Sequence, residues 1–345
     1  MVKTSWKRNS IIFITSLIVI FLLSGCGTTA TKNDVQGIET PGDTDVPGQS
    51  DTAQTVDVTM CLEKVDASRL DDQELPYQRI VVDSNAVAYY MSLYDVPLVG
   101  IPTTSKPLPE EYKGLPEIGI AVNPNIETIV SLNPDLFVGD RVLEHFTKEP
   151  LEKHGITTFY LDNSSYDAVF DSIMELGQLL NREEIGAAFI ECQKEKEAAI
   201  LADIDHLHDK KVALILGTAE YYKLGTANSY LGSILEKIGV VNIAGKIGET
   251  DQDYVTFSKE SLIAENPDYI FALAHGGNPA EVKKSFEQEF ADPIWDEITA
   301  KKENQIFYLD STNFPVTGTI NNVETMEAIV NLLTEGVTAN GSENE

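Results

Sequence analysis

Short apolar segments recur along the chain and are separated by stretches in which apolar residues follow helical spacing. Short runs rich in β-branched side chains are typical of strands that are buried on both faces. Strands that alternate with helices favour parallel sheets, so we predict an α/β fold with two Rossmann-like lobes and a ligand cleft between them. The predicted strands are residues 79–83, 97–101, 134–138 and 157–161, and then 211–216, 268–273 and 305–309.

One pattern occurs twice. Residues 127–138 and 260–271 each begin with Glu and place Asn-Pro-Asp at the same distance from it. Each copy predicts a short helix, a stop at the proline and then a buried strand. Two copies of one unit indicate two lobes of similar build, although so common a unit can also recur by chance.

Between the copies, residues 166–202 carry apolar side chains at roughly helical spacing, without an interrupting proline. They predict a single long helix that joins the lobes, with two segments divided near Asn181 as the alternative. The lobes would then be residues 57–165 and 203–345.

The N-terminal end has its own pattern. Basic residues precede an apolar run from Ile11 to Leu23, which is short for a membrane span. The run ends in residues 23–26, which resemble the bacterial lipobox. That resemblance implies a signal peptide over 1–25, cleavage before Cys26 and a lipid on its thiol, with an uncleaved anchor as the alternative. Residues 26–56 are rich in Thr, Asp, Gly and Pro and predict a disordered tether.

Charge and cysteine content narrow the range of partners. The net charge of −30 argues against nucleic-acid binding and against electrostatic capture by anionic lipid. If Cys26 is lipidated, only Cys61 and Cys192 remain to form a disulfide. They lie far apart and show no CxxC spacing, so we interpret both as free, structural thiols.

Several motifs, taken in order, resemble the helical-backbone (class III) substrate-binding proteins of ABC importers. The match covers about residues 77–335 and is carried by residues 79–82, 96–102, 115–119 and 123–127. Within that class the chain is most similar to the haem-binding lipoproteins of iron-regulated surface determinant systems, through residues 102–109, 228–232, 274–276, 281–286 and 292–295.

This resemblance implies an extracytoplasmic binding protein that delivers haem to a permease and its ATPase for iron acquisition. It would be a monomer anchored at the outer face of the cytoplasmic membrane through Cys26, and the resemblance adds surface haem-relay proteins as upstream partners. A cobamide or ferric-siderophore carrier of the same class is the alternative, and an anchored adhesion or signalling domain is an alternative from another class. HExxH, GxSxG and P-loop motifs are absent from the sequence, so we do not expect an enzyme.

His275 is the predicted iron ligand, because it follows a predicted strand and imidazole is a good axial ligand for haem iron. A packing histidine is the alternative. The subgroup's second axial ligand is a methionine at the position of Val122, which cannot bind iron. Three interpretations stay open here: five-coordinate iron, a ligand such as Met91, Tyr89 or Tyr90, or another cargo.

The resemblance places further haem contacts at Asn85, Ala86, Thr104 and Ser105, where ordinary turn chemistry is the alternative. The matching acids of the two copies, Glu127 and Glu260, would dock onto the permease. An acid that merely favours the first turn of a helix is the alternative for each.

Overall fold

The computed structural model describes residues 61, 74–218, 221–247, 251–311 and 313–341. They belong to one compact unit, Thr52–Glu345. The predicted signal peptide, Cys26 and the tether over 26–56 lie outside the described residues. Within the described part of the chain, no helix has the length and apolar character needed to cross a membrane.

A parallel four-stranded sheet forms the centre of the N-terminal lobe, in the order β2-β1-β5-β6. Its inner strands are buried on both faces, as their continuous apolar sequences predict. Helices α2 and α5 pack on one face with the main core, and α3 and α4 belong to a smaller cluster on the other face. The elements are β1 (Ile80–Val82), α2 (Asn85–Leu93), β2 (Leu98–Gly100), η2 (Glu110–Tyr112), β3 (Gly119–Ile120), β4 (Asn123–Pro124), α3 (Ile126–Ser131), β5 (Leu136–Asp140), η3 (Arg141–Leu143), α4 (Glu144–Lys153) and β6 (Thr157–Leu161).

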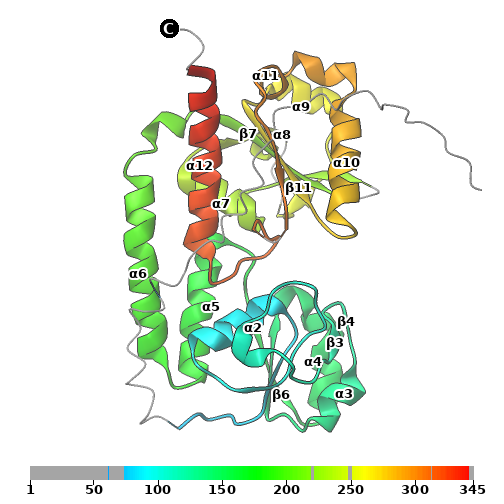
Figure 1. Cartoon of the computed structure of the whole chain (residues 1–345), viewed down its shortest axis with the longest axis vertical. Coiled ribbons are helices and arrows are strands. Elements are labelled where there is room, and N and C mark those ends of the chain that lie inside the picture. The colour runs from blue at the N-terminus through cyan, green and yellow to red at the C-terminus, as the bar shows by residue number, and fades with distance from the viewer. Residues whose placement is uncertain (1–60, 62–73, 219–220, 248–250, 312, 342–345) are drawn as a thin grey trace, which may run out of the picture. The chain divides into compact units, whose positions relative to one another are not determined.

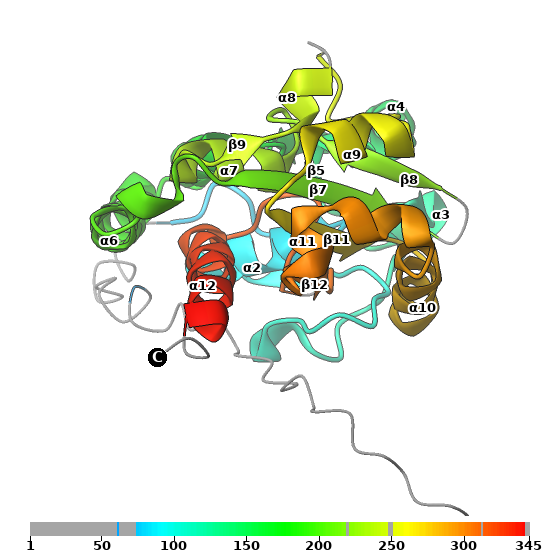
Figure 2. The same ribbon diagram turned by 90° about the horizontal axis from the view of Figure 1, so that it is seen from above.

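The C-terminal lobe holds a mixed sheet in the order β10-β8-β7-β11-β12, with β9 beside β7. The three predicted strands of this lobe are β7, β11 and β12, which run parallel; the antiparallel β8 and β10 were not predicted. Helices α7 and α12 cover one face, while α9 and α10 lie on the other (Figure 2). The elements are η4 (Asp205–Leu207), β7 (Lys211–Gly217), β8 (Tyr222–Gly225), α7 (Tyr230–Ile238), β9 (Val241–Asn242), α8 (Ala244–Ile247), β10 (Tyr254–Val255), α9 (Lys259–Glu265), β11 (Tyr269–Ala274), α10 (Pro279–Phe290), η5 (Pro293–Glu297), α11 (Thr299–Lys302), β12 (Ile306–Leu309) and α12 (Asn322–Gly341).

The predicted bridge is two helices, α5 (Tyr166–Leu179) and α6 (Glu183–Leu201), rather than one unbroken helix. The chain reverses at Asn181, whose φ of 56° is left-handed, and the amide of Arg182 donates to the carbonyl of Gly177. Asparagine tolerates this conformation better than most residues. The two helices pack side by side, and α6 also contacts α12 of the other lobe (Figure 1). The alternative of two segments near Asn181 is therefore confirmed.

The interpretation of Cys61 and Cys192 as free thiols is wrong, because they form a disulfide. Their Cα atoms lie 5.7 Å apart although 131 residues separate them in sequence. Both side chains are buried, and Cys192 lies on α6. The disulfide thus fixes the start of the folded unit to α6.

One core extends through both lobes. The main cluster of buried side chains joins α2 and the N-terminal sheet to α5 and α6, and continues to α7, α12 and one face of the C-terminal sheet. Where α6 meets α12, Lys196 lies 2.9 Å from the buried Glu324, and Gln193 donates to the same carboxylate oxygen at 3.0 Å. The lobes are therefore joined by packed helices as well as by chain connections.

Candidate functional site

The two copies of the duplicated unit share a hydrogen bond between an aspartate and a backbone amide. Asp135 precedes β5 and accepts the amide of Arg79 at 2.9 Å, while Asp268 precedes β11 and accepts the amide of Lys211 at 2.8 Å. In each copy the asparagine before the proline is left-handed, with φ of 46° at Asn133 and 45° at Asn266. These residues end α3 and α9 and turn the chain into the next strand. The predicted helix–stop–strand unit is therefore confirmed in both places.

His275 directly follows β11, as predicted, and its amide donates to the carbonyl of Gly217 at the end of β7. The side chain is half-buried. Burial and the nearby Lys106 ammonium both lower the pKa of His275, which favours the neutral imidazole that binds metals. Gly276 and Gly277 follow with positive φ and are exposed, so the two residues directly after His275 carry no side chain.

Lys106 brings a cation from the N-terminal lobe to His275. Its Nζ donates to the carbonyl of Ser311, just after β12 of the C-terminal lobe, at 3.1 Å. Burial lowers the pKa of Lys106, although Asp310 opposes that shift. An ammonium group between the lobes can pair with a carboxylate of a bound ligand, and the sequence reasoning did not identify it. In the sequence, the only indication that Lys106 lies near a ligand is that it follows the predicted contacts Thr104 and Ser105.

The predicted contacts of the N-terminal lobe follow neighbouring strands. Asn85 is the first residue of α2, after the capping Ser84, and Ala86 is buried. Thr104 accepts the amide of Lys106 at 3.0 Å, which is turn chemistry, and Ser105 is exposed. Because β1 and β2 are parallel neighbours, both segments lie at the same edge of the sheet. Their roles toward a ligand stay predictions.

Val122 lies in the turn between β3 and β4, and 55% of it is exposed. It belongs to a set that the sequence reasoning missed, the large apolar residues that are exposed in the described part of the chain. The set follows the C-terminal ends of β5 and β7 or lies in the β3–β4 hairpin, which contacts α4. Exposed apolar side chains near the C-terminal ends of parallel strands are typical of a surface that receives an apolar ligand. The members are Ile120, Val122, Val142, Phe146 and Tyr221.

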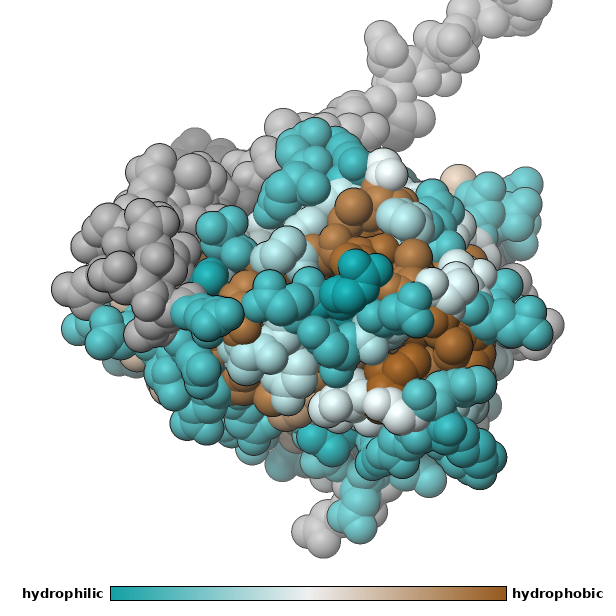
Figure 3. Space-filling view, turned by 90° about the horizontal axis from the view of Figure 1, so that it is seen from below, coloured by the Kyte–Doolittle hydropathy of each residue, from teal (hydrophilic) through white to brown (hydrophobic). Residues whose placement is uncertain are grey.

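Glu127 and Glu260 occupy equivalent places. Both are exposed in the first turn of a short helix, and the helices are capped by Asn125 and Ser258 respectively. Figure 3 shows an apolar patch among hydrophilic residues on the end of the N-terminal lobe where α3 lies. Each acid is therefore available to a partner and also favours its helix dipole, so exposure alone does not separate the two interpretations.

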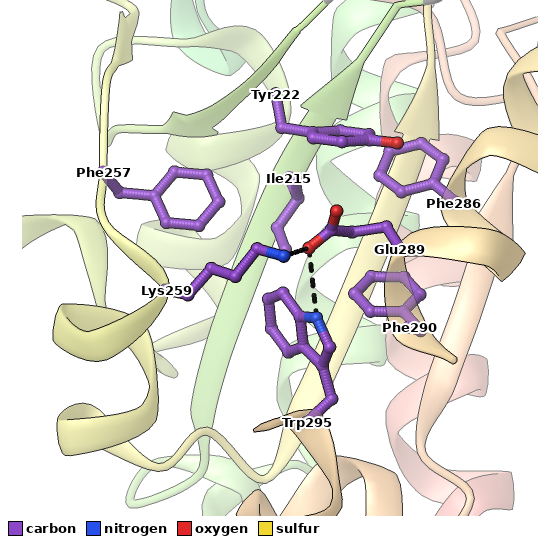
Figure 4. Close-up of a pocket in the computed structure, with 8 residues that line it drawn as sticks. All are labelled: Ile215, Tyr222, Phe257, Lys259, Phe286, Glu289, Phe290 and Trp295. Carbon is purple, nitrogen blue, oxygen red and sulfur yellow. Dashed lines mark hydrogen bonds and ion pairs between the residues drawn. The ribbon is translucent and has the colours of Figure 1, made fainter. Parts of the chain in front are cut away.

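Two of the cavities in the described part of the chain stand out, and neither of these two suits a tetrapyrrole. The first, of about 140 Å³, lies in the C-terminal lobe between β8, α9 and α10 (Figure 4). Inside it, Lys259 lies 2.5 Å from Glu289, which also accepts the indole N–H of Trp295 at 3.1 Å. Small-molecule sites typically measure about 300–1,000 Å³, so this cavity is too small. The second cavity, of about 720 Å³, lies where α5 meets α7. Its lining includes four acidic side chains and one lysine, which suits neither an apolar macrocycle nor its carboxylates.

The described residues contain no cluster of three or more His, Cys, Asp or Glu that could hold a metal ion. His275 by itself could offer a metal ion one imidazole nitrogen, so the remaining ligands would have to come with the bound molecule. The arrangement therefore suits a preformed metal complex better than a bare ion.

The comparisons with known proteins agree with this architecture. A sequence profile described as "Periplasmic binding protein" matches residues 88–312, well over half of the chain. The chain belongs to the periplasmic binding protein family. It is 29% identical over 259 residues to the high-affinity heme uptake system protein IsdE of Staphylococcus aureus, across 74% of this chain and 86% of that protein.

Two solved structures are similar as well. An ABC transporter substrate-binding protein of Listeria monocytogenes superposes with a TM-score of 0.68 at 28% identity, over 74% of this chain and 98% of that one. IsdE of Staphylococcus aureus, complexed with heme, gives a TM-score of 0.65 at 28% identity, over 75% and 99%. The predicted two-lobe fold and family are thus confirmed. The chain is an extracytoplasmic, non-enzymatic binding protein of class III, a class that works with an ABC permease and ATPase.

Proposed function

We propose that this periplasmic binding protein carries haem to its permease, with His275 as an axial ligand of the iron. The observation that carries the proposal is a half-buried imidazole at the end of β11, whose pKa is lowered by burial and by Lys106. It lies near Lys106, a cation of the other lobe that would meet a propionate. The exposed apolar residues at the strand ends offer contacts to a flat macrocycle. The identity to a heme uptake protein supports the same cargo.

The arginines of the structure favour haem over a ferric siderophore. Sites for strongly anionic chelates need free cations, but the three described arginines make structural hydrogen bonds to backbone carbonyls. Arg79 donates to Leu132 and Asn133, Arg141 to Tyr160, and Arg182 to Asp95. Lys106 is a cation that acts on His275.

The proposal is tested by adding haemin to a chain of residues 27–345, which contains the whole compact unit. We expect a Soret band that saturates at equal concentrations of haemin and protein. In His275→Ala the band should shift or vanish, whereas His206→Ala, an exposed histidine in the same lobe, should behave as the parent. No spectral change with haemin, together with tight binding of a cobamide or a ferric siderophore, would replace haem by that cargo.

Delivery would use Glu127 and Glu260 as docking residues, with Cys26 anchoring the protein at the outer face of the cytoplasmic membrane. Charge-assisted contacts of exposed acids with basic residues of a permease suit the acidic surface of the chain. The test measures haem uptake by cells that carry Glu127→Ala together with Glu260→Ala. Uptake should fall strongly, while Glu281→Ala, an exposed acid in the first turn of α10, should have no effect. Normal uptake by the double variant would refute docking through these acids.

The anchor has a separate test. In Cys26→Ala the protein should leave the membrane fraction and appear in the medium. Retention of that variant in membranes would show that another segment anchors it.

A further inference from the structure

If haem binds at His275, its second face would turn toward the N-terminal lobe, where Val122 replaces the methionine that binds iron in the subgroup. The turn of the β3–β4 hairpin offers no substitute, because Ala121 and Val122 carry no donor atom. The alternatives on α2 are occupied elsewhere. Met91 and Tyr90 are fully buried in the main core, and the Tyr90 hydroxyl donates to Asn163 at 2.7 Å.

Tyr89 is half-buried beside a different part of the lobe. Burial raises its pKa, and the charges nearest to it belong to Lys113, Glu111 and Glu110, in and after η2. A phenol must lose its proton to bind ferric iron well, and a raised pKa opposes that loss. Tyr89 is thus a poor substitute for the missing methionine.

The internal repeat indicates where an equivalent ligand would lie. Asp135 and Asp268 are equivalent, so counting seven residues along each copy makes Val142 the counterpart of His275. Val142 follows β5 as His275 follows β11, and 50% of it is exposed. The segment after β5 therefore occupies, in the N-terminal lobe, the place of the predicted ligand in the C-terminal lobe.

That segment carries an imidazole among apolar side chains. His145 is exposed in the first turn of α4, between Val142 and Phe146 of the exposed apolar set, and its ring lies 3.9 Å from the Phe146 ring between centroids. The helix buries Thr147 and Leu151 against the sheet, so His145 lies on its outer side. Side chains tilt toward the start of their helix, here the end of the lobe from which η3 emerges.

We infer that His145 supplies the second axial bond to the iron, so that one imidazole from each lobe holds the cargo. This inference rests on the proposed haem function and replaces the methionine of the subgroup with a histidine from the next segment of the same lobe. The apolar residues around His145 would cover the macrocycle and keep water from the iron. Two imidazoles hold ferric haem in a six-coordinate, low-spin state.

The test compares visible and electron paramagnetic resonance spectra of ferric haem on residues 27–345. The parent should be low-spin, and His145→Ala should become high-spin while still binding haem, with an affinity about tenfold lower. His145→Met should restore a six-coordinate spectrum of mixed imidazole and thioether type. The matched control is His154→Ala, at the other end of α4 and also exposed, which should remain low-spin.

The outcomes separate this inference from the proposed function. A low-spin spectrum in His145→Ala, or a high-spin spectrum in the parent, overturns the role of His145 and leaves haem binding at His275 intact. Absence of any haem signal in the parent overturns the proposed function itself. A parent spectrum that His275→Ala leaves unchanged places the iron away from the lobe junction and overturns both.

Discussion

The two copies of the helix–strand unit agree at one edge of their sheets and differ at the other. At the edge where the strands begin, both use an aspartate that accepts a backbone amide, and a left-handed asparagine before the proline. In both, a cation caps the preceding helix: Arg79 donates to the carbonyl of Leu132, and Lys211 to that of Glu265. This edge holds the helix to the sheet, so both lobes need it.

The opposite edges have diverged. In the N-terminal lobe, Asp83 follows β1 and Asp140 is the last residue of β5. Both are buried, and Asp83 accepts the amide of Asp140 at 3.1 Å. Counting along the repeat, their counterparts are Ile215 and Leu273, which are buried and apolar. The strands of the duplicated unit thus end in buried aspartates in the N-terminal lobe. In the C-terminal lobe the equivalent positions are apolar, and His275 follows them.

The polar end of the N-terminal lobe also meets the C-terminal half of the chain. Asn163 donates to Asp140 at 3.2 Å, and its carbonyl accepts the amide of Gly318 at 2.7 Å. Thr317 hydrogen-bonds to Asp140 as well. The buried acids are therefore part of the region where the two halves of the chain meet. The comparison indicates that the residues at the strand starts stabilise the fold in both lobes, whereas the residues at the strand ends make contacts that differ between the lobes.

The largest expected effect comes from removing the disulfide that fixes Cys61 to α6, the helix that contacts α12 of the other lobe. In the chain-entropy description, a disulfide that closes a loop of more than 100 residues contributes up to about 5 kcal/mol. We expect Cys61→Ser with Cys192→Ser to lower the free energy of unfolding by about 4 kcal/mol, measured by urea denaturation. Reductant should destabilise the parent and leave the double variant unchanged; equal sensitivity of both would contradict the disulfide.

A smaller effect should come from the shared framework. Asp135→Ala and Asp268→Ala each remove an acceptor for the backbone amide at the start of a strand, at a cost of about 1–2 kcal/mol. Because the sites are in different lobes, the two losses should add in the double variant. Urea denaturation measures both. A large loss in one copy and none in the other would show that the frameworks are not equivalent.

The divergent edge predicts a dependence on pH. Burial, and then repulsion by Asp140, raise the pKa of Asp83 well above its usual value. A raised pKa in the folded state means that stability from this group is complete below about pH 4 and is lost as the pH rises through the folded-state pKa. We expect Asp83→Asn to flatten that decline in unfolding free energies measured from pH 4 to 8. An identical slope in the variant would show that Asp83 stays ionised.

The smallest effect concerns the contact between the lobes. Burial is the larger cause of the lowered pKa of His275, and the charge of Lys106 is the second cause. Lys106→Met removes this second cause. We expect the His275 pKa to rise toward its usual value in an NMR titration without ligand, with little change in stability. Lys113→Met, an exposed lysine of the same lobe, is the control. An unchanged His275 pKa would place Lys106 too far away to act on it.

Much of this framework could be predicted from the sequence because it depends on local patterns. Buried strands, the Asn-Pro stop and the position of His275 follow from residues that are neighbours in the chain. The break at Asn181 could not be decided, since apolar spacing continues through it and only the backbone conformation reveals the reversal.

The features that sequence reasoning missed need distant residues to meet. The disulfide joins Cys61 to Cys192, and no spacing rule connects them. Lys106 becomes notable only when Ser311 and His275 lie beside it. Likewise, the apolar residues at the strand ends resemble core residues until the structure shows that they are exposed.

The core that runs through both lobes bears on how a transporter would recognise cargo. Rotating one lobe away from the other would expose part of a continuous apolar cluster to water, at roughly 25 cal/mol for each Å². Empty and loaded forms should therefore have almost the same radius of gyration. The presence of cargo would then change the loops at the strand ends and the surface that the cargo fills. A permease would have to detect these local changes in the surface, because the relative position of the lobes would stay the same.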